Sequence, residues 1–241
     1  MATFDFFYNA AMAEKGGFGI WYEYLAKSRI FKRFSSLKNV LIFGLPEKYS
    51  LGLDTLFFAE NSKLSVLDSR EKPLGDYKKF AEKFKRNIKT ANVQFLGEFK
   101  SKKKYDLVIS TEVIQNDFSL ISTIKSLGKT IIIFVPNKKC YAHPRISGLN
   151  SMSIKELAEL GKKNGLKVID KGYIDCPPWP AGACLPKSED LNKELKDPLY
   201  IKIVKSILTK LVPLLVKFEL FYPSPLKELN SHMIYCIFEN E

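Results

Sequence analysis

The sequence predicts an α/β protein with a doubly wound, mostly parallel sheet and helices on both of its faces. Between residues 39 and 135, short apolar segments alternate with amphipathic segments, and the apolar ones are rich in Val, Ile, Leu and Phe without polar alternation. Strands that are buried on both faces of a parallel sheet have this composition. Strands that alternate with helices form right-handed βαβ crossovers, so the alternation itself predicts the fold class.

Five strands and one helix are expected in this part of the chain. The strands are, in order, Val40–Phe43, Leu64–Leu67, Val93–Leu96, Leu107–Ile109 and Ile131–Val135. A helix is expected over Asp76–Lys89, because apolar residues recur there at helical spacing and Lys side chains fill the other face. Asp76 is its expected N-cap, since an Asp side chain accepts hydrogen bonds from the first backbone amides of a helix.

A second well-marked helix follows the fifth strand. Ser153 and Glu156 have the spacing of a capping box, and Gly165 stands where the C′ residue of a helix should be, which predicts a helix over Ile154–Asn164. Two further strands are expected, at Leu166–Tyr173 and His232–Phe238.

The expected elements divide the chain into three regions. Residues 1–38 form an N-terminal helical flap, residues 39–173 with 232–241 form the sheet domain, and residues 174–231 form an insertion that serves as a lid, a substrate element or a dimer element. The insertion contains a helical stretch, Leu199–Phe218, which Pro213 is expected to interrupt. Its apolar face packs on the sheet domain, forms a homodimer contact or lies on an anionic membrane. Packing and dimerisation are favoured, because so apolar a stripe is costly to expose.

Composition narrows the class of partner. The chain has 241 residues and a formal net charge of +12, with 38 Lys and Arg against 26 Asp and Glu. Such a charge suggests a nucleic-acid partner, but nearly all of it is Lys spread over helix faces, so RNA is the less favoured partner. No apolar run is long enough for a membrane span, and no signal peptide opens the sequence. Four cysteines make no disulfide scaffold in a chain of this size, so a cytoplasmic location is expected.

The loops after the first two predicted strands indicate an adenosine site. In open α/β sheets, ligands bind at the carboxyl ends of the strands. Gly44, Leu45 and Pro46 follow the first strand, and a glycine there lets the backbone turn tightly and approach a ligand. Asp68 and Ser69 follow the second strand, where a carboxylate can accept both hydroxyls of a ribose. The alternative is that Asp68 only caps the segment that follows it.

With these loops, the segment Tyr105–Gln115 resembles the fourth strand of class I S-adenosylmethionine-dependent methyltransferases. The resemblance covers about residues 39 to 173, and His232–Phe238 would supply the antiparallel final strand of that family. It implies a seven-stranded sheet in the order 3-2-1-4-5-7-6 and S-adenosylmethionine as cofactor. It also implies methyl transfer to an acceptor, which we expect to be a small or medium-sized molecule enclosed by the insertion.

The resemblance also implies roles for single residues. Gly44, Leu45 and Pro46 would face the methionine part of the donor, and Asp68, with Ser69 beside it, the ribose. The residues that would lie near the adenine are Gly97 and Glu98. The residues that would border the methyl-transfer centre are Ser110, Thr111 and Glu112.

The first loop departs from the pattern of the family. Ile42 stands where the family usually has an acidic residue, and Pro46 and Lys48 stand where further glycines are usual. A methyltransferase-like domain that has lost catalysis and serves as a binding or assembly module is therefore one alternative. An RNA methyltransferase is another, suggested by the net charge of +12. A nicotinamide-binding Rossmann domain is weaker, because GxGxxG is absent from the sequence.

The N-terminal segment and the loop after the fifth strand supply further candidates. Trp21 or Tyr22 could pack on the donor's sulfonium, where a cation–π contact contributes about 0.5–2 kcal/mol, or else both belong to a buried helical stripe. His143 is a candidate general base, because its reference pKa lies near neutrality, although a structural role is the more common one for a loop His. The residues expected to contact the acceptor are Asn137, Arg145 and Trp179.

No metal is expected. Cys140, His143, Cys176 and Cys184 could in principle assemble four ligands, but no CxxC pair occurs and their spacing fits no zinc knuckle. Unconnected thiols in a reducing compartment are the better interpretation.

Overall fold

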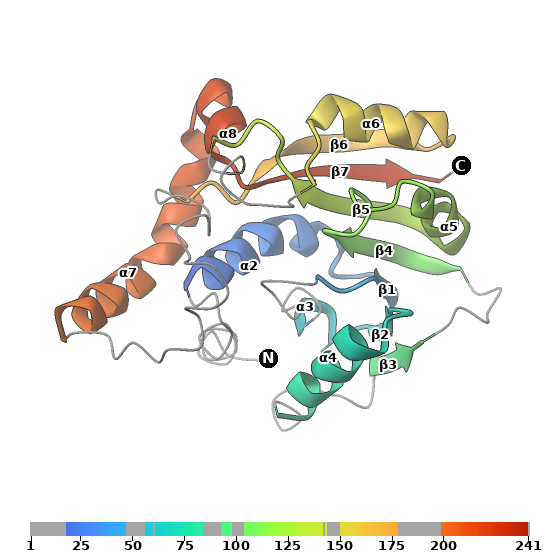
Figure 1. The fold of residues 1–241 in the computed structure, drawn as a ribbon, viewed down its shortest axis with the longest axis horizontal. Helices are drawn as coiled ribbons and strands as arrows, with labels where there is room; N and C mark the ends of the chain where they lie inside the picture. Colours follow the sequence, from blue (N-terminus) through green and yellow to red (C-terminus); the bar gives the residue numbers. More distant parts are fainter. Residues whose placement is uncertain are drawn as a thin grey trace.

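The central feature of the computed structural model is one seven-stranded sheet in the order β3-β2-β1-β4-β5-β7-β6 (Figure 1). The structure describes residues 18–46, 56–59, 61–83, 93–97, 104–141, 143, 150–177 and 199–240. The strands are β1 (Asn39–Phe43), β2 (Lys63–Leu67), β3 (Val93–Leu96), β4 (Tyr105–Thr111), β5 (Gly128–Pro136), β6 (Lys167–Ile174) and β7 (Met233–Glu239). All seven predicted strands are present, and the predicted fold class and strand order are confirmed.

The first five strands are parallel, and β7 runs antiparallel to both of its neighbours. Met233, the first residue of β7, therefore pairs with Pro136 at the end of β5 and with Ile174 at the end of β6. The segments after β5 and β6 and the segment before β7 consequently meet at the carboxyl edge of the sheet. This is the edge at which α/β sheets bind their ligands.

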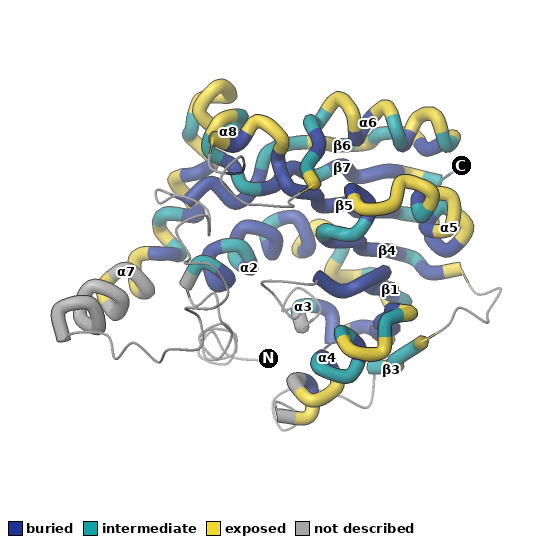
Figure 2. Tube along the Cα trace, viewed as in Figure 1, coloured by how far each residue is buried: buried dark blue, intermediate teal, exposed yellow. Residues whose placement is uncertain are grey.

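Helices cover both faces, as predicted, and each face has its own apolar cluster. Figure 2 shows that the central strands are largely buried. One cluster joins the sheet to α2 (Phe18–Phe31), α3 (Leu56–Ala59), α4 (Glu71–Lys83) and α7 (Leu199–Phe218). The other joins it to α5 (Leu120–Leu127) and α6 (Ile154–Lys163). The remaining described elements are the short 3-10 turns η1 (Lys32–Phe34) and η7 (Glu219–Phe221) and the helix α8 (Ser224–Asn230).

The helix α6 has the predicted caps at both ends. The Ser153 hydroxyl accepts a hydrogen bond from the Glu156 amide at 3.2 Å, and the Glu156 carboxylate accepts one from the Ser153 amide at 2.7 Å. Gly165 has a φ of 69°, the left-handed conformation that a C′ glycine supplies without strain. Local sequence signals thus determine both ends of this helix.

Two predicted helix limits are wrong, and both involve proline. α4 begins at Glu71, so Asp76 lies inside the helix and is not its N-cap. Pro73 occupies the first turn, where its missing N–H would have had no intrahelical partner anyway. α7 runs through Pro213 without interruption, with Val212 and Val216 buried in the same cluster as α2.

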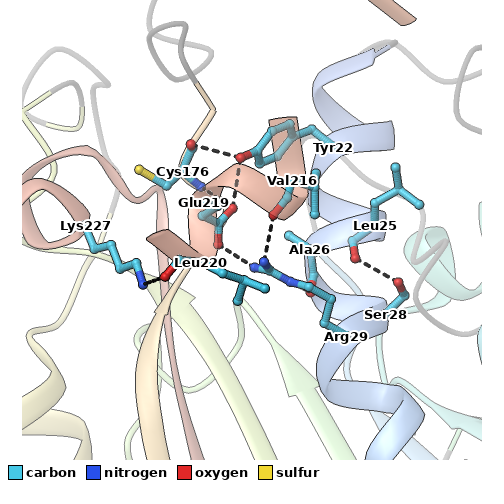
Figure 3. A network of polar contacts seen from close by, with 10 residues as sticks. All are labelled: Tyr22, Leu25, Ala26, Ser28, Arg29, Cys176, Val216, Glu219, Leu220 and Lys227. Atoms are coloured by element: carbon cyan, nitrogen blue, oxygen red, sulfur yellow. Dashed lines mark hydrogen bonds and ion pairs between the residues drawn. The ribbon is translucent and has the colours of Figure 1, made fainter. Parts of the chain in front are cut away.

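The end of α7 is joined to α2 by a buried network centred on Glu219 (Figure 3). The Glu219 carboxylate, 2% exposed, accepts hydrogen bonds from Arg29 Nη2 at 2.6 Å, from the Tyr22 hydroxyl at 2.9 Å and from the Cys176 amide at 3.1 Å. Arg29 Nη1 also donates to the Val216 carbonyl at 2.8 Å. These contacts join the N-terminal helix to the insertion. The division of the chain into flap, sheet domain and insertion stays a prediction.

Candidate functional site at the carboxyl edge of the sheet

Gly44 makes the turn at the end of β1. Its φ is 76°, and a Cβ placed there would lie 2.6 Å from Val113 Cγ2, which follows β4. The Gly44 amide donates to the Leu67 carbonyl at 2.7 Å, so the turn is joined to the end of β2. Leu45 and Pro46 follow as buried residues. Glycine is required at this position both for its backbone conformation and for the close approach of Val113.

Asp68, the predicted ribose residue, is buried at the end of β2 with 4% of its surface exposed. Its Oδ2 accepts hydrogen bonds from the Leu45 amide at 2.8 Å and from Arg70 Nη2 at 2.6 Å. Its Oδ1 accepts two more, each at 2.9 Å, from the amide and from Nε of Arg70. Arg70 Nη2 also donates to the Leu45 carbonyl at 2.5 Å. The guanidinium therefore bridges the loops after β1 and β2.

Burial alone would raise the pKa of Asp68, but these hydrogen bonds, chiefly those from Arg70, hold it below its usual value. The carboxylate is thus ionised at neutral pH and able to accept hydrogen bonds. The Arg70 side chain is 37% exposed, so it lies at the surface of the two loops and not in the core.

The end of β4 contains a buried hydroxyl, on Ser110, that has no hydrogen-bond partner among the described residues. Ser110 has no exposed surface, and its hydroxyl makes no hydrogen bond to any described residue. Such a group costs about 1–3 kcal/mol, so it indicates a water or ligand position. Thr111 is buried beside it, and Glu112 has a φ of 56°, in the left-handed region where non-glycine residues are uncommon.

The other predicted donor residues divide into three kinds. Ser69 and Gly97 lie exposed, after β2 and β3 respectively. Glu98 lies outside the described residues. Tyr22 is fully buried and its hydroxyl also donates to the Cys176 carbonyl at 2.9 Å. Burial and the adjacent Glu219 carboxylate raise the pKa of Tyr22, so it stays a neutral donor.

Asn137, predicted to contact the acceptor, and His143, the predicted general base, follow β5, and both are buried. The Asn137 side-chain nitrogen donates to the Glu228 carbonyl at 2.7 Å and to the Ser231 carbonyl at 2.9 Å. His143 Nδ1 lies 2.7 Å from the Asn137 carbonyl oxygen. A carbonyl oxygen only accepts, so Nδ1 carries the hydrogen and Nε2 is the basic nitrogen. Burial lowers the pKa of His143, which keeps the ring neutral.

Two residues of this edge, Asp175 and His232, were not among the predicted site residues. His232 Nδ1 lies 3.1 Å from Oδ2 of Asp175, and the His143 and His232 rings lie 6.2 Å apart. The His232 amide also donates to the Asp175 carbonyl at 2.8 Å. A signal for them existed. If the last strand is antiparallel, the residue before it and the residues after the preceding strands meet at one edge, and the only two histidines of the chain stand there.

Arg145 and Trp179 lie outside the described residues. Among the residues that the structure describes, no group of three or more His, Cys, Asp or Glu side chains could hold a metal ion. Cys176 and Cys140 are both buried and form no disulfide with a described residue, and burial raises the pKa of Cys176 to about 11. Cys176 is therefore protonated and unreactive at neutral pH.

Comparison with known proteins gives a fold but no closer relative. No family model matches the chain, and no curated protein matches it. The structure is similar to coclaurine N-methyltransferase bound to N-methylheliamine and SAH, with a TM-score of 0.51, 12% identity, and 90% of this chain and 72% of that one covered. It is similar to StiE O-MT residues 961–1257, with a TM-score of 0.50, 18% identity and coverages of 89% and 73%.

A third similar structure is the methyltransferase domain of bacterial CtHen1-CN, with a TM-score of 0.50, 15% identity, and 88% of this chain and 95% of that one covered. At these identities the likeness shows the fold alone. With the observed strand order, it shows that the chain has the fold of class I S-adenosylmethionine-dependent methyltransferases.

Proposed function

We propose that the protein is an S-adenosylmethionine-dependent methyltransferase that acts on a small or medium-sized acceptor. The observation that carries the proposal is the position of Asp68. An ionised carboxylate lies at the end of β2, hydrogen-bonded to the turn that Gly44 makes at the end of β1. In a sheet of this order, ligands bind across the ends of these central strands.

The residues at this edge fit the donor if the ribose replaces Arg70 as the hydrogen-bond partner of Asp68. The Asp68 carboxylate would hold the ribose hydroxyls after the Arg70 guanidinium leaves, and it would keep its hydrogen bond from the Leu45 amide. The buried Ser110 hydroxyl would gain the partner that it lacks among the described residues. When bound, S-adenosylmethionine would supply an electrophilic methyl group. Catalysis then depends mainly on in-line alignment of the acceptor with it.

The acceptor's proton would pass to one of the two histidines at the edge of the sheet. The Nε2 atom of His143 is basic because its Nδ1–H is held by the Asn137 carbonyl. His232 Nδ1 lies 3.1 Å from Oδ2 of the buried Asp175, whose carboxylate would orient the ring so that Nε2 faces away from it.

Titration calorimetry with S-adenosylmethionine and S-adenosylhomocysteine tests the proposal. Both should bind the wild-type chain, and Asp68→Asn should weaken both by about tenfold or more, because the carboxylate accepts charge-assisted hydrogen bonds that an amide cannot replace. Asp170→Asn is the matched control. Asp170 pairs with Arg33 at 2.5 Å on β6, away from the ends of β1 and β2, so donor affinity should not change. Unchanged affinity in Asp68→Asn would disprove the ribose assignment.

A methyltransferase-fold protein without catalysis is the second candidate, and one specific observation favours it. Ile42, which stands where the family usually has an acidic residue, is buried in the core. Failure of both S-adenosylmethionine and S-adenosylhomocysteine to bind at millimolar concentration would establish this candidate over the enzyme.

A further inference from the structure

The insertion has an unusual concentration of exposed apolar side chains. Eight of the eleven large hydrophobic residues exposed in the described part of the chain belong to α7, η7 and α8. They are Ile207, Leu211, Leu214, Phe218, Leu220, Phe221, Leu226 and Leu229. We call them the insertion face. α7 and α8 lie together at one end of the molecule (Figure 1).

The insertion face is distinct from the surface by which α7 joins the fold. Val212, Val216 and Glu219 are buried toward α2, so the packing predicted for this helix is already satisfied on that side. Ile207, Leu211, Leu214 and Phe218 recur at intervals of four, three and four residues, which places them on one stripe of the helix. α7 is therefore apolar on two sides, and the described residues cover only one of them.

The charges around the insertion face are mostly positive. Between residues 199 and 230 the basic residues are Lys202, Lys205, Lys210, Lys217 and Lys227, and the acidic residues are Glu219 and Glu228. Glu219 is buried and bound by Arg29, and Glu228 pairs with Lys139, so neither leaves an unpaired negative charge at the surface. Lys210 and Lys217 are exposed, and helical spacing places both beside the stripe.

We propose that the insertion face docks on an anionic lipid membrane, with α7 lying in the plane of the interface. Exposed Leu and Phe side chains flanked by Lys are the combination that inserts at a headgroup boundary. Phe221, 81% exposed at the turn after α7, is the leading anchor. A second copy of the chain fits less well, because it would bring its own lysines against these and because each chain carries a net charge of +12. The proposal does not depend on methyltransferase activity.

No helix among the described residues is long and apolar enough to cross a membrane. The proposed contact is therefore one of docking at the surface. Its strength would come from apolar insertion together with the attraction between Lys side chains and anionic headgroups.

Vesicle flotation of the full chain tests the proposal. The chain should float with vesicles of equal phosphatidylcholine and phosphatidylglycerol at low salt, and not with phosphatidylcholine alone. High salt should weaken binding, since the Debye length shrinks from about 10 Å at 0.1 M to about 3 Å at 1 M. Phe221→Glu and Leu214→Glu should each weaken binding about tenfold or more.

Matched controls separate the insertion face from general effects of charge. Ile169 on β6 is 49% exposed and Leu214 is 48% exposed, so Ile169→Glu makes the same change elsewhere and should leave flotation unchanged. Lys210→Gln with Lys217→Gln should weaken binding roughly tenfold or more, whereas Lys155→Gln with Lys162→Gln on α6 should have little effect. Circular dichroism melting checks that every variant folds.

Three results would overturn the proposal. One is absence of the wild-type chain from the anionic vesicles at every salt concentration, and another is equal flotation of Phe221→Glu and the wild type. The third is a dimer in sedimentation velocity that Leu214→Glu dissociates, which would assign the insertion face to a second copy.

Discussion

At the scale of single residues, the Arg70 guanidinium and a bound ribose would compete for the same acceptor. Both Asp68 oxygens accept hydrogen bonds from Arg70, and the same side chain reaches the Leu45 carbonyl. A side chain that is 37% exposed loses little packing when it moves, so the exchange mainly costs hydrogen bonds.

Arg70→Ala should therefore tighten S-adenosylmethionine binding, by roughly tenfold if the lost competition is worth about 1.4 kcal/mol. The same substitution should lower the free energy of unfolding by about 1–3 kcal/mol, because buried Asp68 loses a charged partner. Calorimetry and urea denaturation measure the two effects. Arg33→Ala, which breaks a more exposed pair with Asp170, is the control and should change neither by much. Weaker donor binding in Arg70→Ala would show instead that the guanidinium contributes to the site.

Gly44→Ala should destabilise the fold by about 2–4 kcal/mol, because its φ of 76° disfavours a side chain and its Cβ would meet Val113 at 2.6 Å. Val113→Ala in the same chain should recover the part of the loss that comes from the contact and leave the backbone part. Gly75→Ala in α4, where an added Cβ meets nothing within 4 Å, should be neutral or slightly stabilising. Additive effects of Gly44→Ala and Val113→Ala in urea denaturation would disprove the contact.

Residue-level signals in the sequence identified the site only in part. Asp68 and Gly44 could be placed because a residue type at a strand end has a limited set of roles in this fold. The Arg70 contact could not, since it depends on the path of the chain two residues beyond Asp68. His232 and Asp175 required the pairing of β6 and β7, which is a contact between segments far apart in the chain.

At the scale of elements, the junction between α2 and α7 depends on Glu219. Arg29, the Tyr22 hydroxyl and the Cys176 amide each donate a hydrogen bond to this carboxylate, so removing it takes one acceptor from each of them. Figure 3 shows that its three donors come from α2 and from the segment that follows β6. The carboxylate thus joins the N-terminal helix, α7 and β6.

Glu219→Ala should lower the free energy of unfolding by about 3–5 kcal/mol, since it removes a buried charged acceptor from three hydrogen bonds, one of them from the partly exposed Arg29. Tyr22→Phe removes only one hydroxyl from the same network and should cost about 1–2 kcal/mol. Asp170→Asn, at the more exposed pair, should cost at most about 1 kcal/mol. Urea denaturation of the three variants ranks their losses in the free energy of unfolding. Equal losses in Glu219→Ala and Asp170→Asn would contradict a structural role for the network.

The elements show where local signals suffice. α6 was predictable to within a residue because its cap residues act on backbone groups a few positions away. The start of α4 was predicted five residues late, since Pro73 was not recognised as a first-turn residue. The continuity of α7 was not predictable from Pro213 alone, because buried contacts with α2 support the helix on both sides of it.

At the scale of the whole molecule, the question is whether the net charge of +12 reflects binding to a nucleic acid. The lysines of α4 and α6 whose side chains the structure describes are exposed, and Lys79 pairs with Asp76 and Lys155 with Glu159 on the same helix. Such pairs are typical of a solvated helix face.

RNA affinity measured against salt should therefore show a shallow log–log slope, because few phosphates would be neutralised by Lys or Arg. Each phosphate contact contributes about −0.7 to −0.9 to the slope, so several contacts would be obvious. A steep slope, with affinity lost in a variant that removes exposed Lys on α4, would favour RNA as the acceptor. Structured and single-stranded RNA would then have to be compared.

The antiparallel strand β7 has a consequence for biosynthesis. In the described sheet β6 pairs only with β7, and β7 lies between β5 and β6. While a ribosome is still translating residues 233–239, the finished β5 has an open edge and β6 has no place in the sheet. Unpaired edges of this kind recruit strands from other chains. The nascent protein is thus most prone to aggregation shortly before β7 emerges, which makes chaperone binding most useful at that stage of translation.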